Sequence, residues 1–335
     1  MRPTSPRALS RRTAVAGLVA AAGLVSRPAI LRAQGTWPER PVRIVVPFTP
    51  GGSTDIIARA LGAELQQALG QPFVVENRGG AGGTVGCEVV AHAAPDGYTL
   101  LMGHIGTLAV NPSLYRNLTY DTVTSFAPVV LAAVVPNVMV VNPRKVPVNG
   151  VPELVALAKR RPGALTYGSG GNGSAAHIAM VAFNLATSTE MTHVPYRGTA
   201  PMMNDLISGT IDLTLTGGPP ALPPVRAGLL RALGVSSLHR LSGAPDIATL
   251  SEQGITDFDA TQWYGLLAPA ATPRPIVERL NGECARILRG AALRPRLQAE
   301  GAEPAPGSPE AFRDFILAER TRWAEVVRRA DMRPD

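Results

Sequence analysis

The chain contains few cysteines. Cys87 and Cys284 are the only two among 335 residues, and neither belongs to a Cys-x-x-Cys pair or lies near a histidine at the spacing of metal ligands. We therefore expect no thiol redox site and no cysteine-bound metal. The two cysteines lie in separate predicted helices, and the sequence leaves open whether they form one disulfide or remain two buried thiols.

The chain also lacks an excess of charge outside its N-terminus. Residues 1–34 hold six arginines, no lysine and no acid, whereas the formal net charge of the whole chain is +7. The remaining residues are therefore close to neutral, and the basic surface that binds a nucleic-acid backbone is missing. We predict no nucleic-acid partner. With 45% hydrophobic and 17% charged residues, the composition predicts one large globular domain or two medium ones.

No apolar run is long enough to span a membrane. The longest candidate, residues 14–25, is well short of the ~20 residues that a spanning helix needs. This run follows Arg11 and Arg12 and precedes a possible cleavage site near Ala33 and Gln34. Residues 1–34 are therefore predicted to be a cleaved export signal. The paired arginines favour the twin-arginine route. We expect a soluble periplasmic protein; a short membrane anchor is the alternative.

Strand and helix patterns alternate along the rest of the chain. We predict strands at residues 42–48, 73–77, 98–102, 138–141, 165–168, 192–194, 211–215 and 231–235, and helices at 56–69, 84–93, 151–161, 175–186, 202–207, 273–288 and 309–329. Such alternation predicts mostly parallel sheets flanked by helices. We expect an α/β protein of two lobes, one comprising residues 36–137 with 263–335 and the other residues 138–262, with a ligand cleft between them.

Five loops that follow predicted strands have a similar composition. Because ligands bind beyond the carboxyl ends of strands in open parallel sheets, these loops should form one rim. They combine glycine with Ser, Thr or Asn and read PGGSTD (50–55), GHIGT (103–107), GSGGNGS (168–174), VPYRGT (194–199) and TGGPP (216–220). Backbone amides at helix starts favour an anion, so the rim predicts a carboxylate site. For the first loop alone, an ordinary turn capped by Ser53 or Thr54 is the alternative.

Other chemistries have less support in the sequence. Residues 168–173 match G-x-G-x-x-G, but Glu190 precedes the third strand of its unit, so dinucleotide binding is not expected. The chain has no P-loop and no G-x-S-x-G elbow, and its five histidines lack metal-ligand spacing. A secreted serine hydrolase remains an alternative, and it would have to pair one of Ser53, Ser169 and Ser174 with His104 or His177. We predict no metal, no cofactor and no catalytic residue.

Several motifs together resemble one protein family. They include RIVVPFTPGGSTDIIARAL, GQPFVVENRGGAGGTVG, APDGYTLLMGHIGTLAVNPSLY, YGSGGNGSAAH and MTHVPYRGTAPMMNDLISGTID. Along nearly all of the mature chain, the sequence resembles the substrate-binding proteins of tripartite tricarboxylate transporters, the Bug or TctC family. The resemblance implies a non-enzymatic periplasmic binding protein of the type II-like fold, and we expect a monomer. It would close over a small carboxylate and deliver it to membrane permease subunits; a ligand-presenting adaptor for a sensor protein is the alternative.

The resemblance also implies which residues hold the ligand. At the matching positions these are Gly51, Gly52, Ser53, Thr54, Asp55, Thr107, Ser169, Asn172, Ser174 and His177. Asp55 would either orient its loop or accept a hydrogen bond from the ammonium group of an amino-acid ligand.

Two further residues bear on the choice of ligand. Arg197 stands where relatives have lysine, and its guanidinium could clamp a distal carboxylate or simply be solvated. Thr216 stands where many relatives have Asp or Asn. Both differences favour a dicarboxylate or another ligand without an amino group; an amino acid or a nicotinamide-like compound remains open.

Overall fold

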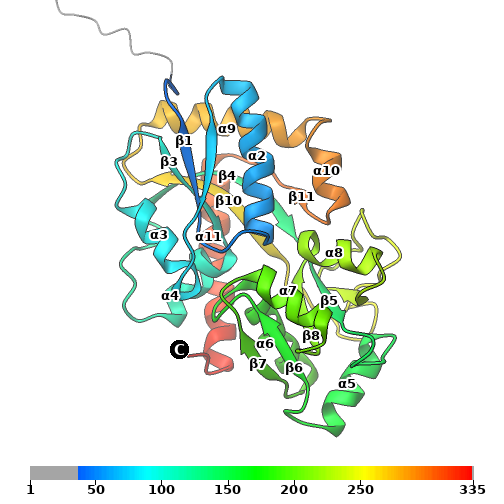
Figure 1. Cartoon of the computed structure of the whole chain (residues 1–335). Helices are drawn as coiled ribbons and strands as arrows, with labels where there is room; N and C mark the ends of the chain where they lie inside the picture. The colour runs from blue at the N-terminus through cyan, green and yellow to red at the C-terminus, as the bar shows by residue number, and fades with distance from the viewer. Residues whose placement is uncertain (1–36, 334–335) are drawn as a thin grey trace, which may run out of the picture. The chain divides into compact units, whose positions relative to one another are not determined.

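Two β-sheets organise residues 37–333, which are the residues that this computed structural model describes (Figure 1). The first sheet has six strands in the order β11-β4-β10-β3-β1-β2, and the second has five in the order β7-β6-β8-β5-β9. Both sheets belong to one compact unit that begins at Pro38. The predicted export signal, residues 1–34, lies outside the described residues.

The first sheet combines a parallel half with an antiparallel half. Strand β1 (Val42–Val46) pairs in parallel with β2 (Phe73–Asn77) and β3 (Thr99–His104). Its β-branched sequence, VRIVV, suits a buried central strand. Strand β10 (Gln262–Pro269) is buried along its whole length and pairs antiparallel with β3 and β4 (Phe126–Val135), and β4 also pairs antiparallel with β11 (Glu303–Pro304).

The second sheet has the same mixed pattern. Strand β6 (Thr166–Ser169) pairs in parallel with β7 (Thr192–Pro195) and β8 (Leu213–Gly217). Strand β5 (Asn137–Val141) pairs antiparallel with β8 and with β9 (Arg231–Val235). The fold class predicted from the sequence is confirmed, but the sheets are mixed instead of mostly parallel. The reason is that the chain crosses between the sheets through β4–β5 and back through β10, and these crossing strands run against their neighbours.

Helices connect the strands and cover the sheets. Those of the first sheet are α2 (Ser53–Leu69), α3 (Thr84–Ala91), α4 (Asn111–Leu114), α9 (Arg274–Arg289), α10 (Arg294–Ala299) and α11 (Pro309–Arg329), with short turns η1 (Ala81–Gly83) and η2 (Gly106–Val110). Those of the second sheet are α5 (Val151–Arg160), α6 (Ala175–Thr187), α7 (Thr199–Ser208) and α8 (Gly218–Arg226). Helix α11 contacts β4 and also α6, so it links the two sheets (Figure 1). None of the described helices is long and apolar enough to cross a membrane.

The core extends through both sheets. One cluster of buried apolar residues includes Val45 and Leu101 of the first sheet together with Tyr167 and Leu213 of the second. Cys87 and Cys284 are both buried and free, which answers the question that the sequence left open about a disulfide. Burial raises the pKa of each thiol to about 12, so both stay protonated at neutral pH.

Candidate functional site

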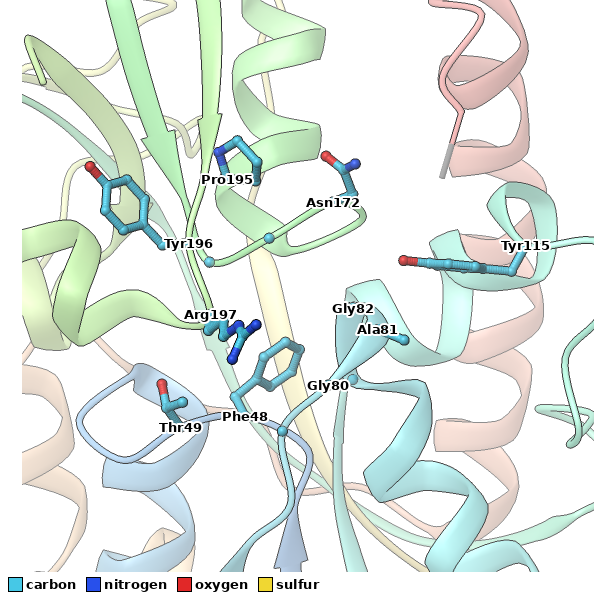
Figure 2. Close-up of a pocket in the computed structure, with 14 residues that line it drawn as sticks. Phe48, Thr49, Gly80, Ala81, Gly82, Tyr115, Asn172, Pro195, Tyr196 and Arg197 are labelled. Atoms are coloured by element: carbon cyan, nitrogen blue, oxygen red, sulfur yellow. The ribbon is translucent and has the colours of Figure 1, made fainter. Parts of the chain in front are cut away.

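A cleft of about 660 Å³ lies where loops of the two sheets meet (Figure 2). From the first sheet it is lined by the loops that follow β1 and β2 and by the residue that follows α4. From the second sheet it is lined by the loops that follow β6 and β7. The lining residues are Phe48, Thr49, Gly79, Gly80, Ala81, Gly82, Gly83, Tyr115, Gly170, Gly171, Asn172, Pro195, Tyr196 and Arg197.

The loops of the two sheets touch at glycines beside this cleft. Gly198 has a φ of +133°, and a Cβ added to it would lie 1.7 Å from Thr49 Oγ1. A Cβ on Gly52 would lie 3.1 Å from Thr199 Oγ1, and one on Gly51 would lie 3.3 Å from Ala200 Cβ. Glycine is therefore required at Gly198, where both the backbone conformation and the space exclude a side chain.

Two helix N-termini approach each other at this contact. Helix α2 begins after Gly52 and helix α7 after Gly198, and neither has a hydrogen bond from a capping side chain. Helix α6, by contrast, is capped by Ser174, whose hydroxyl accepts a hydrogen bond from the His177 amide. First-turn amides carry partial positive charge and seek an acceptor. The approach of α2 to α7 therefore suits a bound anion.

Asp55 supports the first rim loop. Its carboxylate accepts hydrogen bonds from the Gly51 amide at 3.1 Å, from Arg59 Nε at 3.0 Å and from Asn77 Nδ2 at 3.0 Å. Asn77 Nδ2 also donates to the Phe48 carbonyl. Burial alone would raise the pKa of Asp55, but these hydrogen bonds and the nearby charge of Arg59 outweigh burial and lower it. Of the two roles considered for Asp55, the geometry favours orientation of the loop.

Ser53, Thr54 and Thr216 lie inward from the cleft lining. Each is buried, with at most 5% of its surface exposed. A Cβ on Gly217 would lie 2.5 Å from Ser53 Oγ, so the start of α2 contacts the end of β8. The Ser53 hydroxyl therefore belongs to the contact between the sheets, and none of the three residues is among those that line the cleft.

Thr107 is also turned away from the cleft. It is fully buried, its amide donates to His104 Nδ1 at 3.1 Å, and its hydroxyl donates to the His104 carbonyl at 3.0 Å. The His104 ring stacks on Phe48, with centroids 4.5 Å apart, and Phe48 lines the cleft. Burial lowers the pKa of His104 to about 4, so the ring is neutral at pH 7. Thr107 therefore holds a histidine that supports a wall of the cleft.

Ser169 and His177 hold the loop that follows β6. Ser169 Oγ lies 2.6 Å from His193 Nε2 and accepts from the Gly171 amide at 3.1 Å. His177 Nδ1 accepts from the Gly173 amide at 3.1 Å, and its ring stacks on that of His193 with centroids 4.0 Å apart. Burial and the neighbouring His193 lower the pKa of His177 to about 3. Both side chains fix backbone positions of the loop instead of lining the cleft.

The serine hydrolase alternative would require an accessible hydroxyl. The structure pairs Ser169 with His193, a histidine that sequence reasoning did not consider for this role. Ser169 is fully buried behind Gly170 and Gly171, which line the cleft. In the described part of the chain, no group of three or more His, Cys, Asp or Glu side chains could hold a metal ion.

Asn172 and Arg197 are the two predicted site residues that line the cleft. Arg197 is exposed, and its guanidinium makes no ion pair or hydrogen bond with the described residues. No aspartate or glutamate is among the lining residues. Figure 2 shows Arg197 beside Phe48, whereas the Tyr196 ring points away, and its hydroxyl donates to Asp205 Oδ2 at 2.7 Å. A negatively charged ligand would therefore meet one free cation and no acid.

Sequence reasoning missed several lining residues. Phe48 and Thr49 directly precede the PGGSTD motif, and Tyr115 follows a four-residue helix that the sequence did not predict. Residues 79–83, GGAGG, form a glycine-rich loop after a predicted strand, so the rule that identified the other loops could have found them. Asn77 and His193, which hold the rim loops from behind, had no signal of their own.

The chain is similar in sequence and structure to several known proteins. Residues 57–332 match the TctC family, described as the Tripartite tricarboxylate transporter family receptor. BugT of Bordetella pertussis is 37% identical over 321 residues, which cover 96% of this chain and 97% of BugT. A structure of an R. palustris protein with adipate is 38% identical, with a TM-score of 0.87, and the match covers 89% of this chain and 100% of that one. MatC of Rhodopseudomonas palustris with bound malate is 34% identical, with a TM-score of 0.82, and the match covers 87% and 100%.

Proposed function

The chain belongs to the TctC family of tripartite tricarboxylate transporter receptors, and from this premise we propose that it captures a small carboxylate in the cleft between its two sheets. It would do so in the periplasm, after removal of residues 1–34, and as a monomer. It would deliver the ligand to the membrane permease subunits of a tripartite tricarboxylate-type transporter. Binding and delivery need no catalytic residue, metal or cofactor.

The observation that carries this proposal is the approach of the α2 and α7 N-termini. Gly52 and Thr199 come within contact distance, and neither helix has a side-chain cap. A carboxylate placed there would accept hydrogen bonds from first-turn amides of both sheets at once. Because the two helices belong to different sheets, such a ligand would stabilise the arrangement in which the sheets are close together.

The lining of the cleft supports a ligand with a second negative charge. Arg197 is its one charged residue, and Asp55 already accepts hydrogen bonds from Gly51, Arg59 and Asn77. An ammonium group would therefore meet no free carboxylate, whereas a second carboxylate could pair with the guanidinium. The two similar structures hold adipate and malate, which are both dicarboxylates. We propose a dicarboxylate with one end at the two helix N-termini and the other near Arg197.

Closure would take place about the strands that cross between the sheets. We propose that residues 36–137 with 263–335 move as one lobe and residues 138–262 as the other. The crossings lie between β4 and β5 and at the start of β10. A ligand that contacts both lobes shifts the population toward the closed form, which a permease can distinguish from the open one.

A thermal-shift screen tests this function. The mature protein, refolded to remove carried-over ligand, would be tested against adipate, malate, a tricarboxylate, aromatic acids, amino acids and nicotinamide. A ligand at one hundred times its dissociation constant adds about 2.7 kcal/mol to the free energy of unfolding. We expect a dicarboxylate to raise the melting temperature most. A shift with nicotinamide alone would contradict a carboxylate site.

A matched pair of ligands tests the role of Arg197. Adipate and hexanoate share a six-carbon chain and differ by one carboxylate. Arg197→Gln should weaken adipate binding about tenfold, because it removes a charge-assisted hydrogen bond worth about 1.5 kcal/mol, and should leave hexanoate binding unchanged. Arg279→Gln, which changes an exposed arginine of α9 outside the cleft, is the control. If Arg197→Gln weakened adipate and hexanoate binding equally, Arg197 would not contact the second carboxylate.

A further inference from the structure

Two polar side chains lie at the points where the chain passes between the sheets. Asn137 begins β5 two residues after β4 ends at Val135, and it pairs with Gly217 of the second sheet. Gln262 begins β10 and pairs with Val135 of the first sheet. Any change in the relative position of the two sheets must take place around these residues. Both are buried, with at most 4% of their surface exposed.

The side chains of Asn137, Gln262 and Tyr264 are joined by hydrogen bonds, and we call these three residues the crossing network. Gln262 Nε2 donates to Asn137 Oδ1 at 2.5 Å, and Tyr264 Oη donates to Gln262 Oε1. Asn137 Nδ2 donates to the Ala260 carbonyl at 2.7 Å, and the Asn137 amide donates to Ser236 Oγ at 2.9 Å. A buried polar network is rigid when all its groups are satisfied and costly when one partner is removed.

The crossing network reaches the start of α2. A Cβ on Gly217 would lie 2.5 Å from Ser53 Oγ and 2.6 Å from Gln262 Nε2, so both side chains contact the same glycine. The Ser53 and Thr54 side chains are also neighbours of the Tyr264 phenol: burial raises the pKa of the phenol, and these two side chains make that rise smaller. Tyr264 itself is 2% exposed and does not line the cleft.

We infer that Tyr264 is a positioning residue: through the crossing network it holds the first turn of α2 in the orientation that presents its amides to the ligand. This inference rests on the proposed function, because it assigns a role in anion binding to a residue that does not touch the ligand. Loss of the Tyr264 hydroxyl would leave Gln262 Oε1 without its donor and would free the Ser53 end of α2. The bound ligand would then be released faster, whereas its access to the cleft would be unaltered.

The first experiment needs no ligand. Ile56 donates the first backbone hydrogen bond of α2, to the Gly52 carbonyl at 3.0 Å, so its amide exchange with deuterium reports on that turn. In ligand-free protein, Tyr264→Phe should speed exchange at Ile56 at least about tenfold by loss of one buried hydrogen bond. Thr187→Val is the matched control, because the buried Thr187 hydroxyl donates to the Phe183 carbonyl at 2.7 Å near the end of α6, outside the cleft lining and the crossing network.

The second experiment uses adipate as the probe. Tyr264→Phe should raise the dissociation rate of adipate about tenfold and leave its association rate unchanged, and Thr187→Val should change neither rate. Gln262→Met, which breaks the network at another point, should reproduce the effect. Unchanged exchange at Ile56 in both network variants, or equal acceleration by Thr187→Val, would overturn the inference. If the wild-type protein binds no acid, the proposed function fails separately, and exchange at Ile56 still decides the role of Tyr264.

Discussion

The loops that follow β1 and β6 both line the cleft, but different chemistry holds them in place. The first loop is held by charge, since Asp55 accepts hydrogen bonds from the Gly51 amide, Arg59 and Asn77. The second loop is held by a serine hydroxyl and imidazole rings. Ser169 contacts His193 and Gly171, and His177 accepts from the Gly173 amide.

The comparison shows what the polar residues of the two motifs do. In each loop, polar side chains that the motif offers to a ligand hold backbone amides of their own loop instead: Asp55 accepts from Gly51, and Ser169 accepts from Gly171. Six of the fourteen residues that line the cleft are glycines, and Arg197 is the one charged residue among them. An anion site built from amides needs such fixed loops, because each amide must keep its direction when the ligand is absent. The two loops should therefore respond differently to substitution and to pH.

We expect the largest effect on adipate binding from a substitution that keeps the loop after β7 away from the loop after β1. In Gly198→Ala, the new Cβ would lie 1.7 Å from Thr49 Oγ1 at a backbone φ of +133°. The overlap should disfavour the closed form by about 3 kcal/mol and weaken adipate binding at least about a hundredfold, measured by calorimetry. Gly228→Ala is the control, because Gly228 has a φ of +70° and no atom lies within 4 Å of its added Cβ. It should be strained but should bind adipate normally.

A second substitution sharpens this test. Thr49→Ala removes the hydroxyl that the new Cβ would strike, so it should restore part of the adipate affinity to Gly198→Ala. The two changes should couple by about 1 kcal/mol or more in a double-mutant cycle. Strictly additive effects would show that Gly198→Ala acts through backbone strain alone.

Neutralising the support of the first loop should have the next largest effect. Asp55→Asn keeps the shape of the side chain but removes its charge, and we expect the free energy of unfolding at pH 7 to fall by about 2 kcal/mol. Because the folded-state pKa of Asp55 is lowered, its contribution is present above the unfolded value of about 3.9 and is lost as pH falls through the folded pKa. The difference between wild type and variant should therefore vanish in acid denaturation experiments.

Asp121→Asn separates stability from binding. Asp121 accepts hydrogen bonds from the Val123 and Thr124 amides in a loop outside the cleft. Its substitution should also lower stability, but adipate affinity should stay at the wild-type value. Asp55→Asn should lower that affinity several-fold. Equal affinity in the two variants would mean that the first loop keeps its shape without the charge.

Much of the fold can be predicted from local residue patterns in the sequence. Strand β9 (Arg231–Val235) and helix α11 (Pro309–Arg329) have the predicted bounds. Strand β4 was not predicted, because FAPVVLAAVV lacks alternation and becomes a strand through pairing with β10. The TGGPP segment was expected to be a loop, but α8 begins at Gly218. Prolines in its first turn are compatible with a helix because the amides there need no intrahelical acceptor.

The candidate site was harder to predict than the fold. Motif spacing predicts that Thr107 and Ser169 lie in loops at the strand ends, whereas the structure places Ser169 as the last residue of β6 and Thr107 in the short turn η2 that follows β3. The direction of a short hydroxyl side chain depends on partners from distant segments, however, such as His193 for Ser169. Of the five loops that the sequence singles out, those after β6 and β7 supply lining residues of the cleft. Tertiary contacts decide which other segments line it and which atoms face it.

The second loop provides the smallest effect and a contrast in pH dependence. His177, which faces the rings of His193 and Tyr167, has a pKa lowered to about 3. The unfolded chain takes up a proton at that histidine below about pH 6.5, so stability falls as pH drops from there toward 3.

Asn at this position offers an oxygen to the Gly173 amide but does not titrate. Relative to its own value at pH 7.5, His177→Asn should therefore lose about 1 kcal/mol less than wild type at pH 5.5, as measured by urea unfolding. The exposed His239→Asn should keep the wild-type slope. If His177→Asn loses as much stability as the wild type between pH 7.5 and pH 5.5, protonation of His177 is not a source of acid sensitivity. The two loops would then differ only in the charge of Asp55.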